Sequence, residues 1–176
     1  MTRIKPKEFI QTVLINENGE LTDSHPYISF ILMGIGIEFI GKCIDKSLTD
    51  WNVSGRSNQD FENAIKAIPS LKKYEPYLAS HQMYSSFRCG LAHAVSPKLQ
   101  ITLSSKQEMA HLVESNGRLN LKVEDFYNDF KDACNYIISQ NYTNGDKMNA
   151  DFLEVTGLAF NSGTTINSGI TSSLQP

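Results

Sequence analysis

The chain has 176 residues, of which 40% are hydrophobic and 20% charged, with a net charge of −3 at pH 7 and a pI of about 5.8. This length predicts one domain, with or without an appendage, and the share of apolar residues excludes disorder throughout. The negative charge excludes a strongly basic nucleic-acid coat, but not a local basic site.

Cysteine usage and hydropathy indicate a cytoplasmic protein. Cys43, Cys89 and Cys134 are odd in number and far apart, which favours reduced thiols over a disulfide framework or zinc cluster. No signal core is evident near the N-terminus, and the apolar run 28–40 contains Glu38 and is shorter than the about 20 residues that span a bilayer. We expect no membrane segment, no metal and no cofactor.

The first half of the chain predicts helices. Residues 5–16 form a short opening helix with Phe9 and Val13 on one face, and Asn18-Gly19 is expected to stop it. Ser-His-Pro at 24–26 is typical of a helix start, so a second helix is expected over residues 27–47.

That second helix is apolar on several sides, which predicts a place at the centre of a bundle. Gly34 and Gly36 lower its intrinsic helix propensity, and we expect a neighbouring element to approach closely there. A loop at 51–58 precedes a third helix that ends near Pro69, and a short helix over 71–78 follows. The apolar face of the third helix comprises Phe61, Ala64, Ile65 and Ile68.

The second half changes its period. Apolar residues alternate with polar ones over 99–104, and Asn116-Gly117 is a strong hairpin-turn signal, which predicts a small antiparallel β-ribbon inserted at 98–122. A final amphipathic helix is expected over 123–140.

The sequence therefore predicts a mainly α protein, an up-and-down helical bundle in residues 1–145 with an antiparallel ribbon insertion. Residues 146–176 form a C-terminal extension, and eleven of its last sixteen residues are Ser, Thr, Asn or Gly, a composition usual in disordered segments. Apolar residues before that tail could anchor it as a helix or a strand, and they are Phe152, Leu153, Val155, Leu158 and Phe160.

One segment combines a core stripe with residues suited to chemistry. On a helix over residues 80–92, one face is apolar, the opposite face is small, and Arg88 and His93 flank the small face. Small residues allow close packing, so this helix is expected to form a homodimer, with Arg88 of one chain approaching His93 of the other. The apolar face comprises Met83, Phe87 and Leu91, and the small face comprises Ser85, Cys89 and Ala92.

Arginine and histidine together suit metal-independent RNA cleavage. Arginine binds phosphate through a planar fork of donors, and histidine moves protons near neutral pH. The ribose 2′-OH would attack the neighbouring phosphate, with His93 handling a proton and Arg88 stabilising the developing charge.

The run Arg88-Cys89-Gly90-Leu91-Ala92-His93 resembles the R-x4-H motif of the HEPN superfamily, and the surrounding stretch is similar to small bacterial HEPN-like proteins. The resemblance covers residues 5–140. It implies an all-helical dimer, catalytic Arg88 and His93, endoribonuclease activity in bacterial defence, toxin–antitoxin or stress systems, and an antitoxin-like protein partner. Active members commonly carry Asn, Asp or His directly after the arginine, where this chain has Cys89.

Alternatives stay open at this point. Glu38 either supports the site as a buried partner of Arg88 or His93, or points outward near the helix end. Cys89 is a supporting residue or a small interface residue. The whole domain could be a non-catalytic module that binds RNA, a nucleotide or a protein. Candidate RNA contacts are Lys72, Lys73 and Tyr84.

Overall fold

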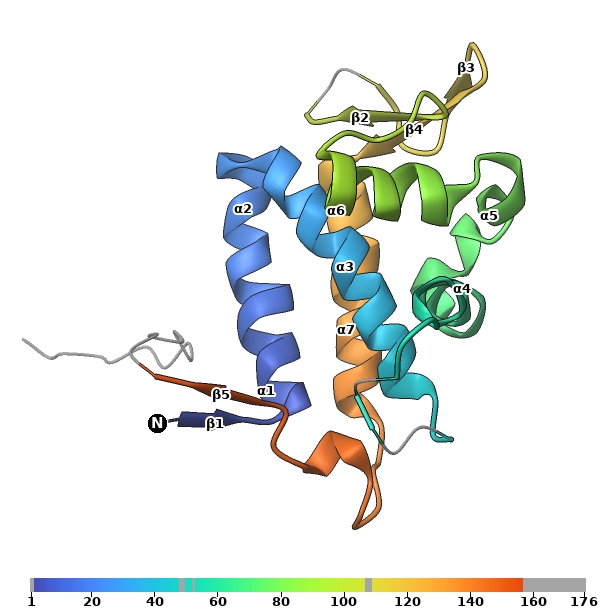
Figure 1. Ribbon diagram of the computed structural model, residues 1–176. Helices are drawn as coiled ribbons and strands as arrows, with labels where there is room; N and C mark the ends of the chain where they lie inside the picture. Colours follow the sequence, from blue (N-terminus) through green and yellow to red (C-terminus); the bar gives the residue numbers. More distant parts are fainter. Residues whose placement is uncertain (1, 48–49, 52, 107–108, 157–176) are drawn as a thin grey trace, which may run out of the picture.

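The structure is a computed structural model that describes residues 2–47, 50–51, 53–106 and 109–156. The described chain is mainly helical with two small sheets, and helix α3 (Pro26–Ile44) lies at its centre (Figure 1). This confirms the mainly α class, whereas the finer likeness to a HEPN bundle stays a prediction. The tail at 161–176, together with Leu158 and Phe160, falls outside the described residues.

The N-terminal helix continues past Asn18-Gly19, so the predicted stop there is wrong. A Cβ atom on Gly19 would lie 2.6 Å from the hydroxyl oxygen of Tyr127, which itself donates a hydrogen bond to the carbonyl of Ile15 at 2.6 Å. The absence of a side chain at Gly19 therefore leaves room for the Tyr127 ring, and the helix does not end there. Three segments form one continuous helical rod, and they are α1 (Pro6–Phe9), the π-helix η1 (Ile10–Glu17) and α2 (Asn18–Ser24).

Helix α3 starts at Pro26, one residue before its predicted start and with the proline in its first turn as expected, and it ends at Ile44, before the predicted end at residue 47. By length and composition it could cross a membrane, but α2, α4, α6 and α7 pack around it, and this burial accounts for its apolar composition. The expected close approaches are confirmed. A Cβ on Gly34 would lie 3.3 Å from the Phe87 ring, and one on Gly36 would lie 2.5 Å from the Phe130 ring.

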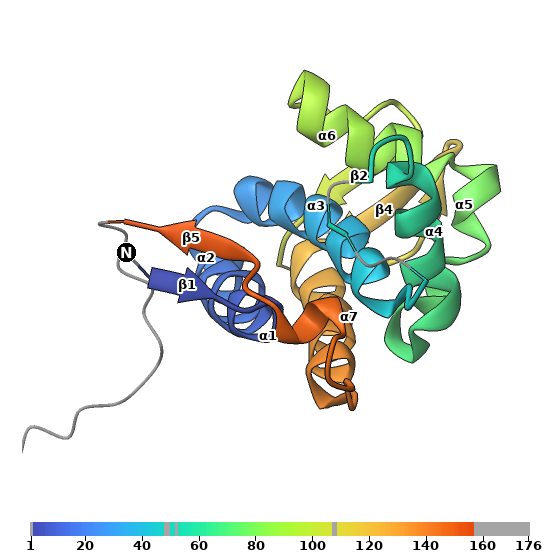
Figure 2. The same ribbon diagram turned by 60° about the horizontal axis from the view of Figure 1, so that its bottom comes forward.

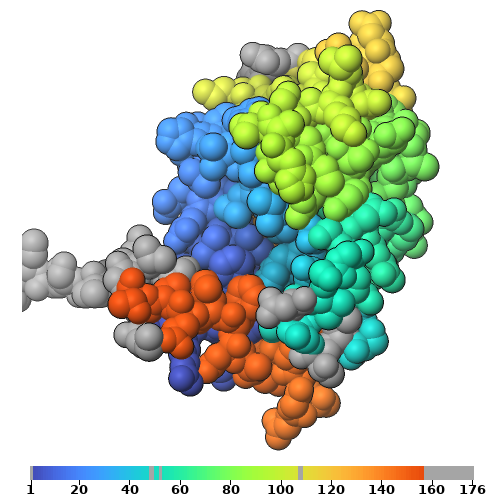
Figure 3. All heavy atoms as spheres, viewed as in Figure 1, coloured from blue at the N-terminus to red at the C-terminus, as the bar shows by residue number. Residues whose placement is uncertain are grey.

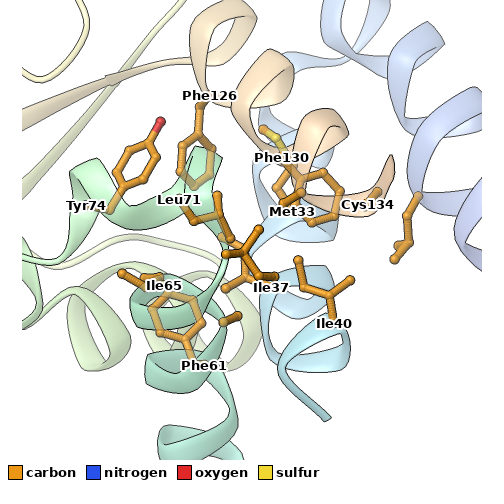
Figure 4. Close-up of a cluster of buried hydrophobic side chains, with 14 of the residues drawn as sticks. Met33, Ile37, Ile40, Phe61, Ile65, Leu71, Tyr74, Phe126, Phe130 and Cys134 are labelled. Atoms are coloured by element: carbon orange, nitrogen blue, oxygen red, sulfur yellow. The ribbon is translucent and has the colours of Figure 1, made fainter. Parts of the chain in front are cut away.

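Three helices from the middle and end of the chain complete the core. The predicted apolar face of α4 is fully buried, and Pro69 opens the next helix where α4 was expected to end. Side chains of α3, α4, η2 and α7 converge in one cluster (Figure 4). These elements are α4 (Ser57–Ala67), η2 (Pro69–Tyr74), α5 (Tyr77–Ser80) and α7 (Val123–Ser139).

The predicted antiparallel ribbon is a mixed sheet of three strands. Its hairpin is confirmed, because Asn116 and Gly117, both at positive φ, join β3 to β4. The outer strand β2 instead pairs parallel to β4. The strands are β2 (Ile101–Ser104), β3 (Glu114–Ser115) and β4 (Arg118–Lys122), in the order β2-β4-β3.

The first part of the C-terminal extension packs on the domain. Strand β5 (Leu153–Val155) pairs antiparallel with β1 (Thr2–Ile4), so the two ends of the described chain lie side by side (Figure 2). The short helix η4 (Lys147–Asn149) precedes it, and the Phe152 ring packs 4.9 Å from that of Phe39. The choice between helix and strand, which the sequence left open, is strand.

Candidate functional site

The segment that carries Arg88 and His93 is shorter and less regular than a helix over 80–92. Gln82 interrupts it with a φ of 46°, after which η3 (Tyr84–Arg88) and α6 (Cys89–Ala94) form one continuous helix. The predicted core stripe is confirmed, since Met83, Phe87 and Leu91 are all buried. Because this stripe packs into the core, it sets the rotation of the helix about its axis, and Arg88 consequently faces α3.

Arg88 and His93 meet within one chain. The Nη1 atom of Arg88 lies 3.4 Å from Nε2 of His93, and the imidazole is exposed. The sequence had predicted this approach between two subunits, and one chain is sufficient to bring the two groups together. A contact across a dimer is a separate proposal.

Glu38 on α3 forms the third member of the group. Its Oε2 atom lies 2.5 Å from Nη2 of Arg88, and its side chain is only 8% exposed. A buried carboxylate requires a cation nearby, so this ion pair accounts for a glutamate in an apolar helix. Of the two alternatives, Glu38 is the buried partner of Arg88.

Lys42 completes the group, and the sequence reasoning missed it. Its ammonium lies 3.5 Å from Oε1 of Glu38, one turn further along α3. The signal was present as a Glu–Lys pair at i and i+4, a spacing that brings opposite charges together on a helix.

Tyr84 and Cys89 lie beside Arg88 in different ways. The Tyr84 ring packs at 5.7 Å from Phe61, and the guanidinium carbon of Arg88 lies 5.9 Å from its centre. Burial raises the pKa of Tyr84, and its hydrogen bond with Cys89 raises it further. Cys89 thus contacts the tyrosine, and both side chains are partly buried. Tyr84 thus lies beside Arg88, and the prediction that it contacts RNA stays a prediction.

The two candidate lysines are not part of this group. Lys73 pairs with Asp129 of α7 at 2.7 Å, and Lys72 is exposed on the same short helix η2. Among the described residues, no ion pair or hydrogen bond joins either lysine to Arg88. The prediction that they contact RNA stays a prediction.

The end of α6 is held in a defined position next to His93. Val95 adopts a left-handed conformation with a φ of 51°, which is unfavourable for a β-branched residue. Tyr27 donates a hydrogen bond to its carbonyl oxygen at 2.5 Å, and the chain then folds back so closely that a Cβ on Gly90 would lie 2.7 Å from the carbonyl of Ser96. Tyr27, which helps to hold the end of α6, is a second residue that sequence reasoning missed.

The arrangement offers a phosphate-binding cation beside an exposed proton carrier. Within the described residues, no group of three or more His, Cys, Asp or Glu side chains is placed to hold a metal ion. Comparison with protein-family models, curated proteins and solved structures found no match to this chain. The inference of function therefore depends on the geometry of these side chains.

Proposed function

We propose that this chain is a HEPN-like, metal-independent endoribonuclease with Arg88 and His93 as its catalytic residues. The observation that carries the proposal is the contact of the Arg88 guanidinium with the exposed His93 imidazole at the end of α6. An arginine and a histidine that meet at a surface can together bind a phosphodiester and move a proton.

The proposed reaction needs only groups that RNA and this chain supply. The 2′-oxygen attacks the adjacent phosphorus, the bond from phosphorus to the 5′-oxygen breaks, and a 2′,3′-cyclic phosphate and a 5′-hydroxyl result. His93 of one chain accepts the proton of the 2′-hydroxyl, and Arg88 stabilises the charge that develops on the phosphoryl oxygens. The protonated His93 of the second chain in the proposed dimer donates a proton to the leaving 5′-oxygen. Before RNA binds, the ion pair with Glu38 holds the guanidinium of Arg88 next to His93.

The proposed assembly is a homodimer formed along α6 and the adjoining face of α3. Ser85, Cys89 and Ala92 are partly exposed, and Ile28 and Ile35 of α3 are 50% and 42% exposed. Atoms of α3 reach the surface beside α6 (Figure 3). A second His93 there would supply the acid for the leaving group. Sedimentation at micromolar concentration should give twice the mass of one chain, and a monomer would contradict the dimer.

The catalytic proposal is tested on mixed RNAs in EDTA. The wild-type protein should yield 2′,3′-cyclic phosphate ends, and Arg88→Ala and His93→Ala should each lose activity by about 100-fold or more. His25→Gln, at an exposed histidine at the start of α3, is the matched control and should cleave as the wild type does. Intact RNA with the wild-type protein across many substrates would reject the enzyme.

A second candidate is a non-catalytic module that binds RNA, a nucleotide or an antitoxin-like protein. The observation that favours it is the ion pair to Glu38, which neutralises the charge that Arg88 would offer a phosphate. Cys89 in place of a polar residue after the arginine also favours it. RNA binding without cleavage in the same assay would select this function.

A further inference from the structure

Four charged or titratable side chains form a row from α3 to α6, in the order Lys42, Glu38, Arg88, His93. Each contact in the row uses a different atom. Glu38 faces Lys42 through Oε1 at 3.5 Å and Arg88 through Oε2 at 2.5 Å, and Arg88 faces His93 through its other terminal nitrogen at 3.4 Å. Glu38 thus lies between two cations, and Arg88 lies between a carboxylate and an imidazole.

Burial makes the departure of Arg88 from Glu38 costly unless another cation takes its place. The side chains of Glu38 and Arg88 are 8% and 13% exposed. If Arg88 turned toward a phosphate, Glu38 would remain as a buried carboxylate without its closest partner. Lys42 is already within ion-pair distance and is 23% exposed, so its ammonium has room to move.

A second buried carboxylate lies close to the same lysine. Asp60 of α4 is fully buried, and burial raises its pKa, while the charges of Arg56 and Lys42 act against the rise. Lys42 therefore contributes positive charge to a region with two buried acids. Lys42 therefore fits the role of a counter-ion whose removal would leave both carboxylates with less positive charge nearby.

We propose that Lys42 is a positioning residue that replaces Arg88 as the counter-ion of Glu38 when Arg88 binds a phosphodiester. The inference rests on the proposed function in taking RNA as the source of that phosphate. Without bound RNA, Glu38 holds Arg88; with RNA bound, Lys42 holds Glu38. Lys42 lowers the energetic cost of releasing the guanidinium and never touches the substrate.

The test measures binding of a fluorescein-labelled 2′-O-methyl oligoribonucleotide, which lacks the attacking hydroxyl, by anisotropy in EDTA. Lys42→Met should weaken binding by about ten-fold, and Lys42→Arg should restore it to within about two-fold of wild type. Lys66→Met is the matched control, because Lys66 forms a similar i,i+4 pair with Glu62 on α4, and it should bind as the wild type does.

The Glu38→Gln background separates counter-ion exchange from direct contact with RNA. With a neutral residue 38, Arg88 leaves no charged carboxylate behind when it binds RNA, so adding Lys42→Met should change binding by less than about two-fold, although the charge of Lys42 still acts on Asp60. The double variant removes both charges, and so it also keeps the test usable if Lys42→Met alone unfolds.

Three results would overturn the inference: wild-type binding by Lys42→Met, no rescue by Lys42→Arg, or an undiminished loss in the Glu38→Gln background. If the wild type cleaves RNA and Lys42→Met binds the oligoribonucleotide as the wild type does, only this inference is rejected. Binding by wild type without cleavage would reject the catalytic proposal alone, and absence of both would reject both.

Discussion

Gly41 shows how one residue without a side chain sets the distance between two helices. A Cβ atom at this position of α3 would lie 1.8 Å from the carbonyl oxygen of Asp60 and 2.6 Å from its carbonyl carbon. Both atoms belong to the backbone of α4, which cannot rotate away as a side chain would. The close contact of α3 with α4, which also brings Lys42 toward Asp60, depends on this glycine.

We expect Gly41→Ala to destabilise the protein by about 3 kcal/mol or more, because overpacking against backbone outweighs the about 1 kcal/mol that alanine gains in helix propensity. Gly34→Ala in the same helix is the control, since its Cβ would lie 3.3 Å from the Phe87 ring and at an ordinary contact distance of 3.6 Å from the Cα atom of Arg88. Urea unfolding should give a much lower midpoint for Gly41→Ala than for Gly34→Ala. Equal midpoints would contradict the predicted clash.

At the scale of an element, a partly buried chain of hydrogen bonds holds His111, which lies between β2 and β3 in the sequence, against η2 and α7. His111 Nδ1 accepts a hydrogen bond from the backbone N–H of Lys122 at 3.0 Å, so Nε2 carries the proton of the neutral ring. Nε2 lies 2.7 Å from the Tyr74 hydroxyl, which donates to Asp129 at 2.5 Å. Lys73 pairs with the other oxygen of Asp129, so one chain of contacts joins His111, η2 and α7.

This chain of contacts predicts that stability falls in acid. Burial lowers the pKa of His111 below its ordinary value, as do Lys73 and Lys122, while Asp129 and Asp125 act in the opposite direction. A group whose pKa is lower in the folded state contributes stability that is present above the unfolded value of about 6.5. That stability is lost as the pH falls through 6.5 toward the folded value.

Urea unfolding at pH 7.5 and 5.5 measures the effect. The wild-type free energy of unfolding should decrease between these values, and in His111→Gln the decrease should shrink because the titrating ring is gone. His25→Gln, which removes an exposed histidine, should leave the decrease as it is in wild type. An unchanged pH dependence in His111→Gln would show that another group is responsible.

At the scale of the whole molecule, the two ends of the described chain pair with each other. Beyond the pairing of β1 with β5, Phe152 contacts the rings of Phe9, Phe39 and Trp51. Lys147 donates a hydrogen bond to the backbone carbonyl of Asp45 at 2.8 Å, just after the end of α3. Residues 146–156 thus contact the N-terminal rod, α3 and the loop after it.

We therefore expect a chain ending at residue 145 to be less stable than one ending at residue 156. Loss of the Phe152 contacts alone should cost about 1 to 2 kcal/mol, because the ring is partly buried and full burial of a phenylalanine contributes about 1.5 to 3 kcal/mol. Thermal unfolding of the two chains compares them directly, and Phe152→Ala in the longer chain isolates the ring. Equal melting temperatures would place the boundary of the stable unit at residue 145.

The site was partly predictable, because Arg88 and His93 stand out by residue type and spacing along one helix. The pairing of Glu38 with Arg88 was one of two alternatives. A charged residue in an apolar helix needs a partner of opposite charge, but its own position does not indicate which residue that partner is. Lys42 lay at a recognisable i+4 spacing, whereas no local pattern links Tyr27 to Val95, which are 68 positions apart.

The sequence by itself determined the helical class, the core faces of α4 and of the helix formed by η3 and α6, the start of α3 near Pro26 and the Asn116-Gly117 turn. Each follows from a local rule, because burial imposes a helical period and a tight turn requires positive φ. Only the tertiary structure decided the parallel pairing of β2 with β4, the closure of β1 on β5 and the meeting of Glu38 with Arg88. These contacts join distant positions, and their choice depends on how the faces of all the elements pack together.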